Sequence, residues 1–426
     1  MQRRPLIWPA PATIAIGEVS GEGGTARMDD GELGQRIAYW RERRGITQKL
    51  LADRIGRSKS WIEKVEAGTR SANRIPILMA ICRELRIDLP VLIGRDPTRD
   101  TRECINDIQV EAIRASLERY DAIRSQIPDG YSADISRLRS QVGYAWSAFE
   151  LADYHVISRT LPDLLLDAQR CHVIMDSTDT ARILAETYQI TASALRKLGE
   201  YELAWLAGDR GVALAERTGD PVLAALTGFR VAIALTSLGR ADSAFNLNVS
   251  YAYRLEPGLR TEADRSVYGH ILLQAAMAAA SGGNAVGVRD MVNEARSVAQ
   301  HVSDQANHYR LAFGPTNVRL HHVAALVGLG EGGLAVEIAA GLDQEGIGML
   351  RRERRATYLI DIARGYSQWG KRDEALEKLL EAERLAPREV DCRPVARNLI
   401  SNLIERSRGK VPVALQSLAD RSGVVA

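Results

Sequence analysis

The chain has 426 residues, with 56 Lys and Arg against 54 Asp and Glu and a net charge of +2. This length predicts more than one domain. Apolar runs of the roughly 18 residues that a membrane helix needs do not occur, which excludes a membrane-spanning protein. The four cysteines lie far apart and form no CxxC pair, so the sequence predicts buried thiols in a reducing cytoplasm.

Residues 1–27 are expected to be an unstructured extension. Three prolines interrupt the short apolar run that follows the basic start, which argues against a secretory signal peptide. The Glu-Gly-Gly run before Met28 is also what a translated purine-rich ribosome site would encode. In that case Met28 would be the natural start.

Residues 28–93 are predicted to form a small helical domain. Leu33, Ile37 and Trp40 make one apolar stripe on a first helix of about residues 30–44. Thr47 is a natural N-cap for a second helix. This helix carries four apolar residues, Leu50, Leu51, Ala52 and Ile55.

A sharp turn and a third helix are predicted next. Gly56 supplies the backbone freedom for the turn, Ser58 caps the helix, and Gly68 ends it. Ile62 and Val65 are expected to face inward. The residues expected on the outward face are Lys59, Ser60, Glu63 and Lys64. A fourth helix over residues 75–85 would close the core with Ile77, Leu78, Ile81 and Leu85.

This segment resembles the phage-repressor (XRE-type) helix-turn-helix family. The shared pattern consists of Arg41, Gly45-Ile46-Thr47-Gln48, Leu51-Ala52, Gly56, Ser58, Ile62, Glu66 and Gly68. The resemblance implies that Gln48 clamps a phosphate at the start of the second helix. It also implies that Lys59, Ser60 and Lys64 meet base edges or nearby phosphates in the major groove.

The resemblance further implies an ion pair between Arg41 and Glu66, which would tie the first helix to the third. Trp61 stands where the family often has Tyr or Ser, and it could pack at the DNA backbone or into the core. The remaining residues expected at the DNA are Arg43, Arg44, Ser58, Arg57 and Arg70.

The alternative for this segment is a helical hairpin with solvated charges. The charge distribution argues against it, because residues 29–95 carry a net charge of +5 whereas residues 96–426 carry −4. A basic head on an acidic body is typical of proteins that bind nucleic acid. Double-stranded DNA is therefore the predicted partner.

Residues 94–102 are polar and contain Pro97, and they are expected to be a linker. A helix over about residues 103–125 should follow. Beyond it, residues 103–426 read almost entirely as helix, without an alternating strand pattern.

Glycines recur between helical stretches at Gly199, Gly239, Gly283, Gly330 and Gly370, with spacings of 40, 44, 47 and 40 residues. Each is flanked by small residues that would let two antiparallel helices approach closely. These are Ala192 and Ala204, Ala232 and Ala244, Ala276 and Val288, Val323 and Ala335, and Ala363 and Ala375.

The last unit resembles a tetratricopeptide repeat, and a degenerate earlier unit is expected over residues 145–164. The spacings that match are those of Tyr366, Gly370, Ala375, Ala382 and Pro387. The resemblance implies an all-α protein, in which a small helix-turn-helix domain precedes a right-handed α-solenoid of about six helix pairs with a concave inner face.

Repeats of this kind bind partners rather than catalyse reactions, and the first helix of each unit would line the concave side. The polar or aromatic residues expected there are Gln189, Ser193, Arg196, Phe229, Thr236, His270, Asn317 and Arg364. Taken singly, each is better explained as a solvated or stacking residue, and only the set taken together favours a binding groove. The charge run at residues 351–355 is expected to be the solvated start of a helix, with a second nucleic-acid contact as the alternative.

No catalytic, cofactor or metal-binding motif is present. The sequence therefore predicts a cytoplasmic bacterial transcriptional regulator similar to actinobacterial XRE regulators with repeats and, in architecture, to the peptide-responsive RRNPP group. It would bind a palindromic operator as a homodimer and sense a peptide or small molecule. The alternative is a DNA-localised scaffold that binds a partner protein through its repeats.

Overall fold

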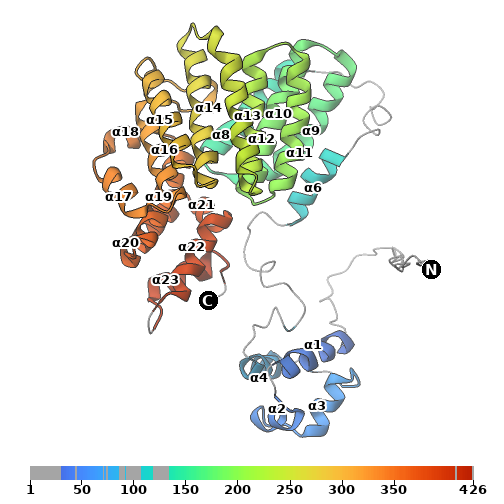
Figure 1. The fold of residues 1–426 in the computed structure, drawn as a ribbon. Helices are drawn as coiled ribbons and strands as arrows, with labels where there is room; N and C mark the ends of the chain where they lie inside the picture. The colour runs from blue at the N-terminus through green and yellow to red at the C-terminus, as the bar shows by residue number, and fades with distance from the viewer. Residues whose placement is uncertain are drawn as a thin grey trace, which may run out of the picture. The chain divides into compact units, whose positions relative to one another are not determined.

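The computed structural model describes residues 30–43, 46–70, 72, 75–85, 92, 107–118, 134–407 and 410–424. Every regular element in these ranges is helical, so the predicted all-α class is confirmed. The chain divides into two compact units, Met1–Pro97 and Thr98–Ala426, and each is described by itself (Figure 1). The predicted extension (1–27) and linker (94–102) lie outside the described residues. Among the described helices, none is long and apolar enough to cross a membrane.

The first unit contains four described helices: α1 (Asp30–Arg43), α2 (Gln48–Arg54), α3 (Lys59–Glu66) and α4 (Ile75–Leu85). The two predicted N-caps are confirmed. The hydroxyl of Thr47 accepts a hydrogen bond from the Leu50 amide at 3.1 Å, and that of Ser58 accepts one from the Trp61 amide at 3.2 Å. These bonds satisfy amides that would otherwise lack partners at the helix starts.

Glycine ends both short helices. Gly56 follows α2 with φ +67° and Gly68 follows α3 with φ +69°, in the region that residues with a Cβ rarely adopt. Beyond Gly56, the amide of Arg57 reaches back to the carbonyl of Ala52 at 2.8 Å. This left-handed ending turns the chain sharply and so sets the angle at which α3 leaves α2.

The core of the first unit contains most of the apolar residues named from the sequence, but Ile55 and Ile77 are only partly buried against it, and the side chain of Trp40 lies outside the described part of the chain. The buried residues include Leu33, Ile37, Leu51, Ala52, Trp61, Ile62, Val65, Leu78, Ile81 and Leu85. Leu50 is 41% exposed. Successive helix residues point about 100° apart, so burial of Leu51 turns Leu50 toward solvent.

Helices α1 and α3 cross at a glycine. A Cβ placed on Gly34 of α1 would overlap the backbone carbonyl oxygen of Val65 in α3. Because Gly34 carries only a hydrogen there, the two helix backbones approach more closely than a residue with a Cβ would allow.

The second unit begins with α6 (Asp107–Glu118) within the helix predicted over residues 103–125. Six helix pairs follow among the described residues: α8 (Ile135–Glu150) with α9 (Tyr154–Met175), α10 (Thr178–Lys197) with α11 (Tyr201–Arg217), α12 (Pro221–Ser237) with α13 (Ala241–Leu255), α14 (Glu262–Ser281) with α15 (Ala285–Ala299), α16 (Pro315–Gly328) with α17 (Gly332–Ala340), and α19 (Arg352–Gln368) with α20 (Arg372–Leu385). The shorter elements are η1 (Glu256–Gly258), η2 (His308–Arg310), α18 (Gln344–Met349), α21 (Pro387–Asp391), α22 (Pro394–Glu405) and α23 (Val413–Arg421).

The five predicted glycine turns are all confirmed. Each lies between the two helices of a pair and has a positive φ, between +72° and +88°. The first pair, α8 and α9, turns instead at Ala152, with φ +59°. A turn without glycine explains why this pair is the hardest to recognise in the sequence.

The small residues around these turns pack as predicted. All ten are at most 2% exposed: Ala192, Ala204, Ala232, Ala244, Ala276, Val288, Val323, Ala335, Ala363 and Ala375. The longest predicted spacing, 47 residues, arises because residues 300–314 form a loop with η2 between α15 and α16.

The first helices of the six pairs form one layer (Figure 1). Each of α8, α10, α12, α14, α16 and α19 contacts the next, and α19 also contacts α8. The layer therefore curves until its last helix meets its first, and the second helices of the pairs lie outside it.

Candidate functional site

The outward face of α3 presents the residues predicted for DNA reading. Ser58, Lys59, Ser60 and Lys64 are all exposed. Lys59 Nζ lies 3.0 Å from Oε1 of Glu63, but both side chains are about half exposed, so this ion pair is weak and readily exchanged for a phosphate.

Arg57 before α3 and Arg70 after it are also exposed and extend the basic surface beyond the helix. The side chains of Arg43 and Arg44 lie outside the described part of the chain. Their predicted role at the DNA stays a prediction.

The expected ion pair between Arg41 and Glu66 is present and joins α1 to α3. Arg41 Nε donates to Glu66 Oε1 at 2.6 Å and Nη2 donates to Oε2 at 3.0 Å, and the two side chains are only 10% and 7% exposed. A third bond runs from Arg41 Nη1 to the carbonyl of Ile46 at 3.1 Å. A two-bond contact between planar groups fixes orientation as well as distance.

Gln48, predicted to clamp a phosphate, belongs to the same network. Its amide donates to Glu66 Oε2 at 2.8 Å, which joins the start of α2 to the end of α3. A phosphate contact would require this amide to exchange one acceptor for another.

Trp61 is only 7% exposed and packs in the core of the first unit. Of the two alternatives for this residue, the structure favours the core. The guanidinium carbon of Arg57 lies 5.5 Å from the centre of its ring. The indole therefore supports α3 from behind and does not belong to the outward face.

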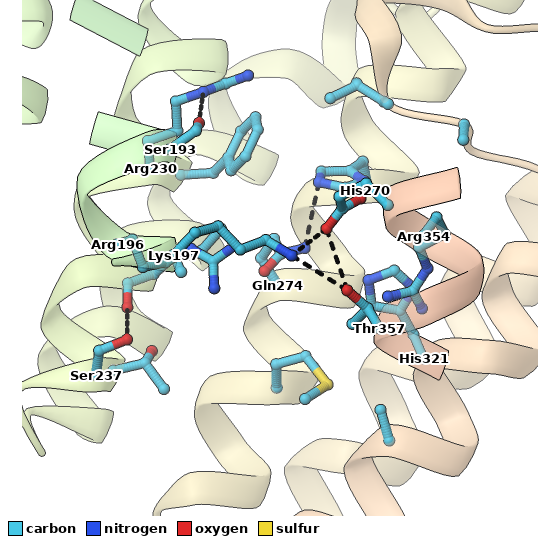
Figure 2. Close-up of a pocket in the computed structure, with 18 of the residues that line it drawn as sticks. Ser193, Arg196, Lys197, Arg230, Ser237, His270, Gln274, His321, Arg354 and Thr357 are labelled. Atoms are coloured by element: carbon cyan, nitrogen blue, oxygen red, sulfur yellow. Dashed lines mark hydrogen bonds and ion pairs between the residues drawn. The ribbon is translucent and has the colours of Figure 1, made fainter. Parts of the chain in front are cut away.

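A cavity of about 600 Å³ lies inside the second unit and is walled by α8, α10, α12, α14, α16 and α19, with the η2 loop and α22 (Figure 2). It contains seven of the eight residues predicted to face a ligand: Ser193, Arg196, Phe229, Thr236, His270, Asn317 and Arg364. The eighth, Gln189, lines a smaller hollow of about 190 Å³, and its amide donates to Thr227 Oγ1 at 2.9 Å.

One wall of the cavity holds Arg230 of α12 between aromatic rings. Its guanidinium carbon lies 4.4 Å from the ring centre of Phe229 and 5.0 Å from that of Trp146, and its Nε donates to Ser193 Oγ at 3.2 Å. Burial lowers the pKa of Arg230 to about 9, because few charges nearby compensate the lost hydration.

The opposite wall holds Arg354 of α19. Its Nε donates to Asn317 Oδ1 at 2.7 Å, and its Nη2 lies 3.2 Å from His321 Nδ1. His270 packs edge-to-face on His321, with ring centres 6.0 Å apart. Burial, with Arg230 and Arg354 nearby, lowers the pKa of His270 to about 3, so this ring is neutral at physiological pH.

A buried charged cluster lies between these walls. The ammonium of Lys197, 1% exposed, contacts Glu353 and donates to both oxygens of Glu389 at 3.0 Å and to Thr357 at 3.1 Å. Burial alone would raise the pKa of Glu353, but the charge of Lys197 lowers it to about 2. The cluster joins α10 to α19 and α21, and so links an early helix pair to the last.

Of the comparisons with known proteins, the match to a family model lies within the first unit. Residues 32–91 match the family model described as a helix-turn-helix domain. These residues therefore form a helix-turn-helix domain. No curated protein matches the sequence. A crystal structure of Bacillus thuringiensis PlcR in complex with the peptide PapR7 and DNA is similar at 13% identity and a TM-score of 0.31, over 84% of this chain and 96% of that chain. At that TM-score the likeness carries no structural inference.

Lys197, Arg230 and Arg354 are among the cavity residues that the sequence did not single out. Arg354 belongs to the charge run at 351–355, which was expected to be solvated; Arg351 and Arg352 are exposed, but Arg354 turns into the cavity. A signal for Arg230 exists, because it is a lone charge in the otherwise uncharged helix α12.

Proposed function

We propose that the protein is a sequence-specific DNA-binding transcriptional regulator of the XRE type, whose second unit dimerises and binds a signal molecule in its cavity. The observation that carries the first part is the exposed basic face of α3, with Lys59, Ser60 and Lys64, on a helix-turn-helix domain. A helix presented in this way fits the major groove, where base pairs show distinct donor and acceptor patterns.

The network of Arg41, Gln48 and Glu66 supports this proposal, because it fixes α3 against α1 and α2. Reading of bases requires side chains held in register with the groove, and a rigid support reduces the entropy lost on binding. Gln48 would then reach a phosphate by giving up Glu66, as the family resemblance implies.

The test is selection of genomic fragments by the purified full-length protein, followed by titration of the selected site. We expect Lys59→Ala, Lys64→Ala to weaken binding by about 1–3 kcal/mol per base contact, or to lower the salt slope by about one per phosphate contact. The matched control, Lys371→Ala, Lys378→Ala, removes the same charge from the second unit and should bind as wild type does. Operator binding by the α3 variant equal to that of wild type would show that α3 is not the reading helix.

A further inference from the structure

The charges that line the large cavity are unbalanced. Eight lining residues are basic (Arg196, Lys197, Arg230, Arg310, Arg351, Arg354, Arg364 and Arg393) and three are acidic (Glu150, Glu353 and Asp361). The second unit as a whole carries more acidic than basic residues. The cavity lining is therefore basic within a unit that is acidic overall.

Five of the eight basic residues have carboxylate partners. Lys197 contacts Glu353 and Glu389, and Arg393 also contacts Glu389. Arg364 contacts Asp361. Likewise Glu150 receives both Arg310 and Arg351. These pairs account for the acidic residues of the lining.

Arg196, Arg230 and Arg354 have no carboxylate within ion-pair distance among the described residues. Arg230 and Arg354 are held by neutral groups, which fix their positions without cancelling their charges. Arg196 projects into the cavity from α10, with Arg354 on the other side (Figure 2), and its guanidinium makes no hydrogen bond to the described residues. Burial lowers the pKa of all three.

A buried ring nitrogen also lacks a partner here. His270 is 9% exposed and lines the cavity, and its Nδ1 is buried without a hydrogen-bond partner among the described residues. Its Nε2 lies 3.2 Å from Gln274 Nε2. A buried polar atom of this kind is normally satisfied, so a ligand is a natural partner for it.

We propose that the cavity binds a small anionic molecule, whose carboxylate or phosphate group contacts Arg196, Arg230 and Arg354 and whose apolar part packs on Phe229 and Trp146. The proposal deepens the signal-binding role proposed above and rests on it. Guanidinium groups bind both anions through paired N–H donors. The volume of about 600 Å³ lies within the range of pockets for small molecules.

The test uses the full-length protein and matched pairs of probes: benzoate with benzamide, and phenyl phosphate with phenol. Benzoate and benzamide differ mainly in charge, whereas phenol lacks the whole phosphate group of phenyl phosphate. Thermal unfolding of the second unit is followed at constant ionic strength with each probe at millimolar concentration, and binding is then titrated by calorimetry. We expect stabilisation by at least one anionic probe beyond its neutral partner, because a ligand that binds only the folded state raises the melting temperature. The two pairs distinguish carboxylate from phosphate.

The decisive variant is Arg196→Gln, since the side chain of Arg196 makes no hydrogen bond or ion pair that holds another described residue in place. It should weaken binding of the preferred anion about tenfold to a hundredfold, the usual effect of losing a charged hydrogen bond. Arg196→Lys should restore part of the affinity. Arg254→Gln is the matched control, because Arg254 belongs to the same unit but does not line the cavity and contacts Glu216 at the surface.

Three outcomes would overturn the proposal: stabilisation of the protein by none of the probes, equal stabilisation by charged and neutral members of each pair, or unchanged anion affinity in Arg196→Gln. Because none of these measurements involves DNA, a failure of anion binding is recorded separately from a failure of operator binding.

Discussion

At the scale of single residues, Glu66 has the largest expected effect in the first unit. Glu66→Ala leaves Arg41 charged and only 10% exposed, without the acceptor of two hydrogen bonds. Removing one partner of a buried pair costs about 3–5 kcal/mol, because the remaining charge stays buried. We expect faster amide hydrogen exchange across α1 and α3, measured by mass spectrometry on the full-length protein.

Glu63→Ala is the control for that change. Glu63 lies on the same helix but contacts the exposed Lys59, and pairs of that kind contribute less than about 1 kcal/mol. Equal exchange rates in the two variants would show that the contact of Arg41 with Glu66 does not hold the helices together.

The buried histidines give the second unit a pH dependence. The pKa of His270 is lowered to about 3, and that of His321 is also lowered, mainly by burial. The unfolded chain binds protons near pH 6.5 while these folded rings stay neutral, so stability is lost as the pH falls from about 6.5 toward 3. Between pH 7 and pH 5 the loss is about 2 kcal/mol per histidine.

Urea denaturation midpoints at several pH values measure this loss. His270→Asn should flatten the dependence, whereas the same change at the exposed His301 should leave it unaltered. A wild-type midpoint that is constant between pH 7 and pH 5 would contradict the neutral state of the buried rings.

At the scale of helices, the crossing of α1 and α3 depends on Gly34. Gly34→Ala would place a methyl group against the carbonyl of Val65, and the two helices would have to separate. We expect a destabilisation of about 1–3 kcal/mol, as for other overpacked cores. In calorimetry, the unfolding transition of the first unit should move to lower temperature.

Gly143→Ala in α8 serves as the comparison. A Cβ at Gly143 meets nothing within 4 Å, so alanine should stabilise that helix by up to about 1 kcal/mol through its better helix propensity. The same substitution thus has opposite expected signs at the two glycines. A neutral Gly34→Ala would mean that the crossing is looser than described.

Local signals explain which elements could be predicted from the sequence. The caps at Thr47 and Ser58 and the turn glycines depend on neighbours within a few residues, and these are confirmed. The cavity charges depend on the curvature of the whole helix layer. Lys197 contacts Glu353 across 156 residues, and no local pattern encodes that distance. The apolar run in the short helix α2 likewise does not identify its buried face, since Leu51 is buried while Leu50 is exposed.

At the scale of the whole molecule, the two units should separate in function. The residues 28–95, produced alone, have a core of their own, and we expect them to be monomeric and to contact one half-site of a palindromic operator. The full chain should dimerise through the second unit and gain up to about 10²–10⁴-fold in affinity from joining two heads. Light scattering and titration of both proteins against one site provide the measurement.

If residues 28–95 alone dimerised and bound the operator with the affinity of the full chain, the second unit would not be needed for dimerisation, and this prediction would be contradicted. The Lys59→Ala, Lys64→Ala variant of the full chain is the control. It should remain dimeric while its affinity for the operator falls.

The contact between α8 and α19 limits how the second unit can respond to any molecule in its cavity. An open array of helix pairs can bend by small rotations at each interface, so its response is graded. In a closed layer, a rotation at one interface must be compensated at the others or the contact must break. Lys197, Glu353 and Glu389 oppose the break, since separating them would leave charges without partners. We therefore expect the second unit to switch between a closed and an opened ring rather than to change its curvature gradually.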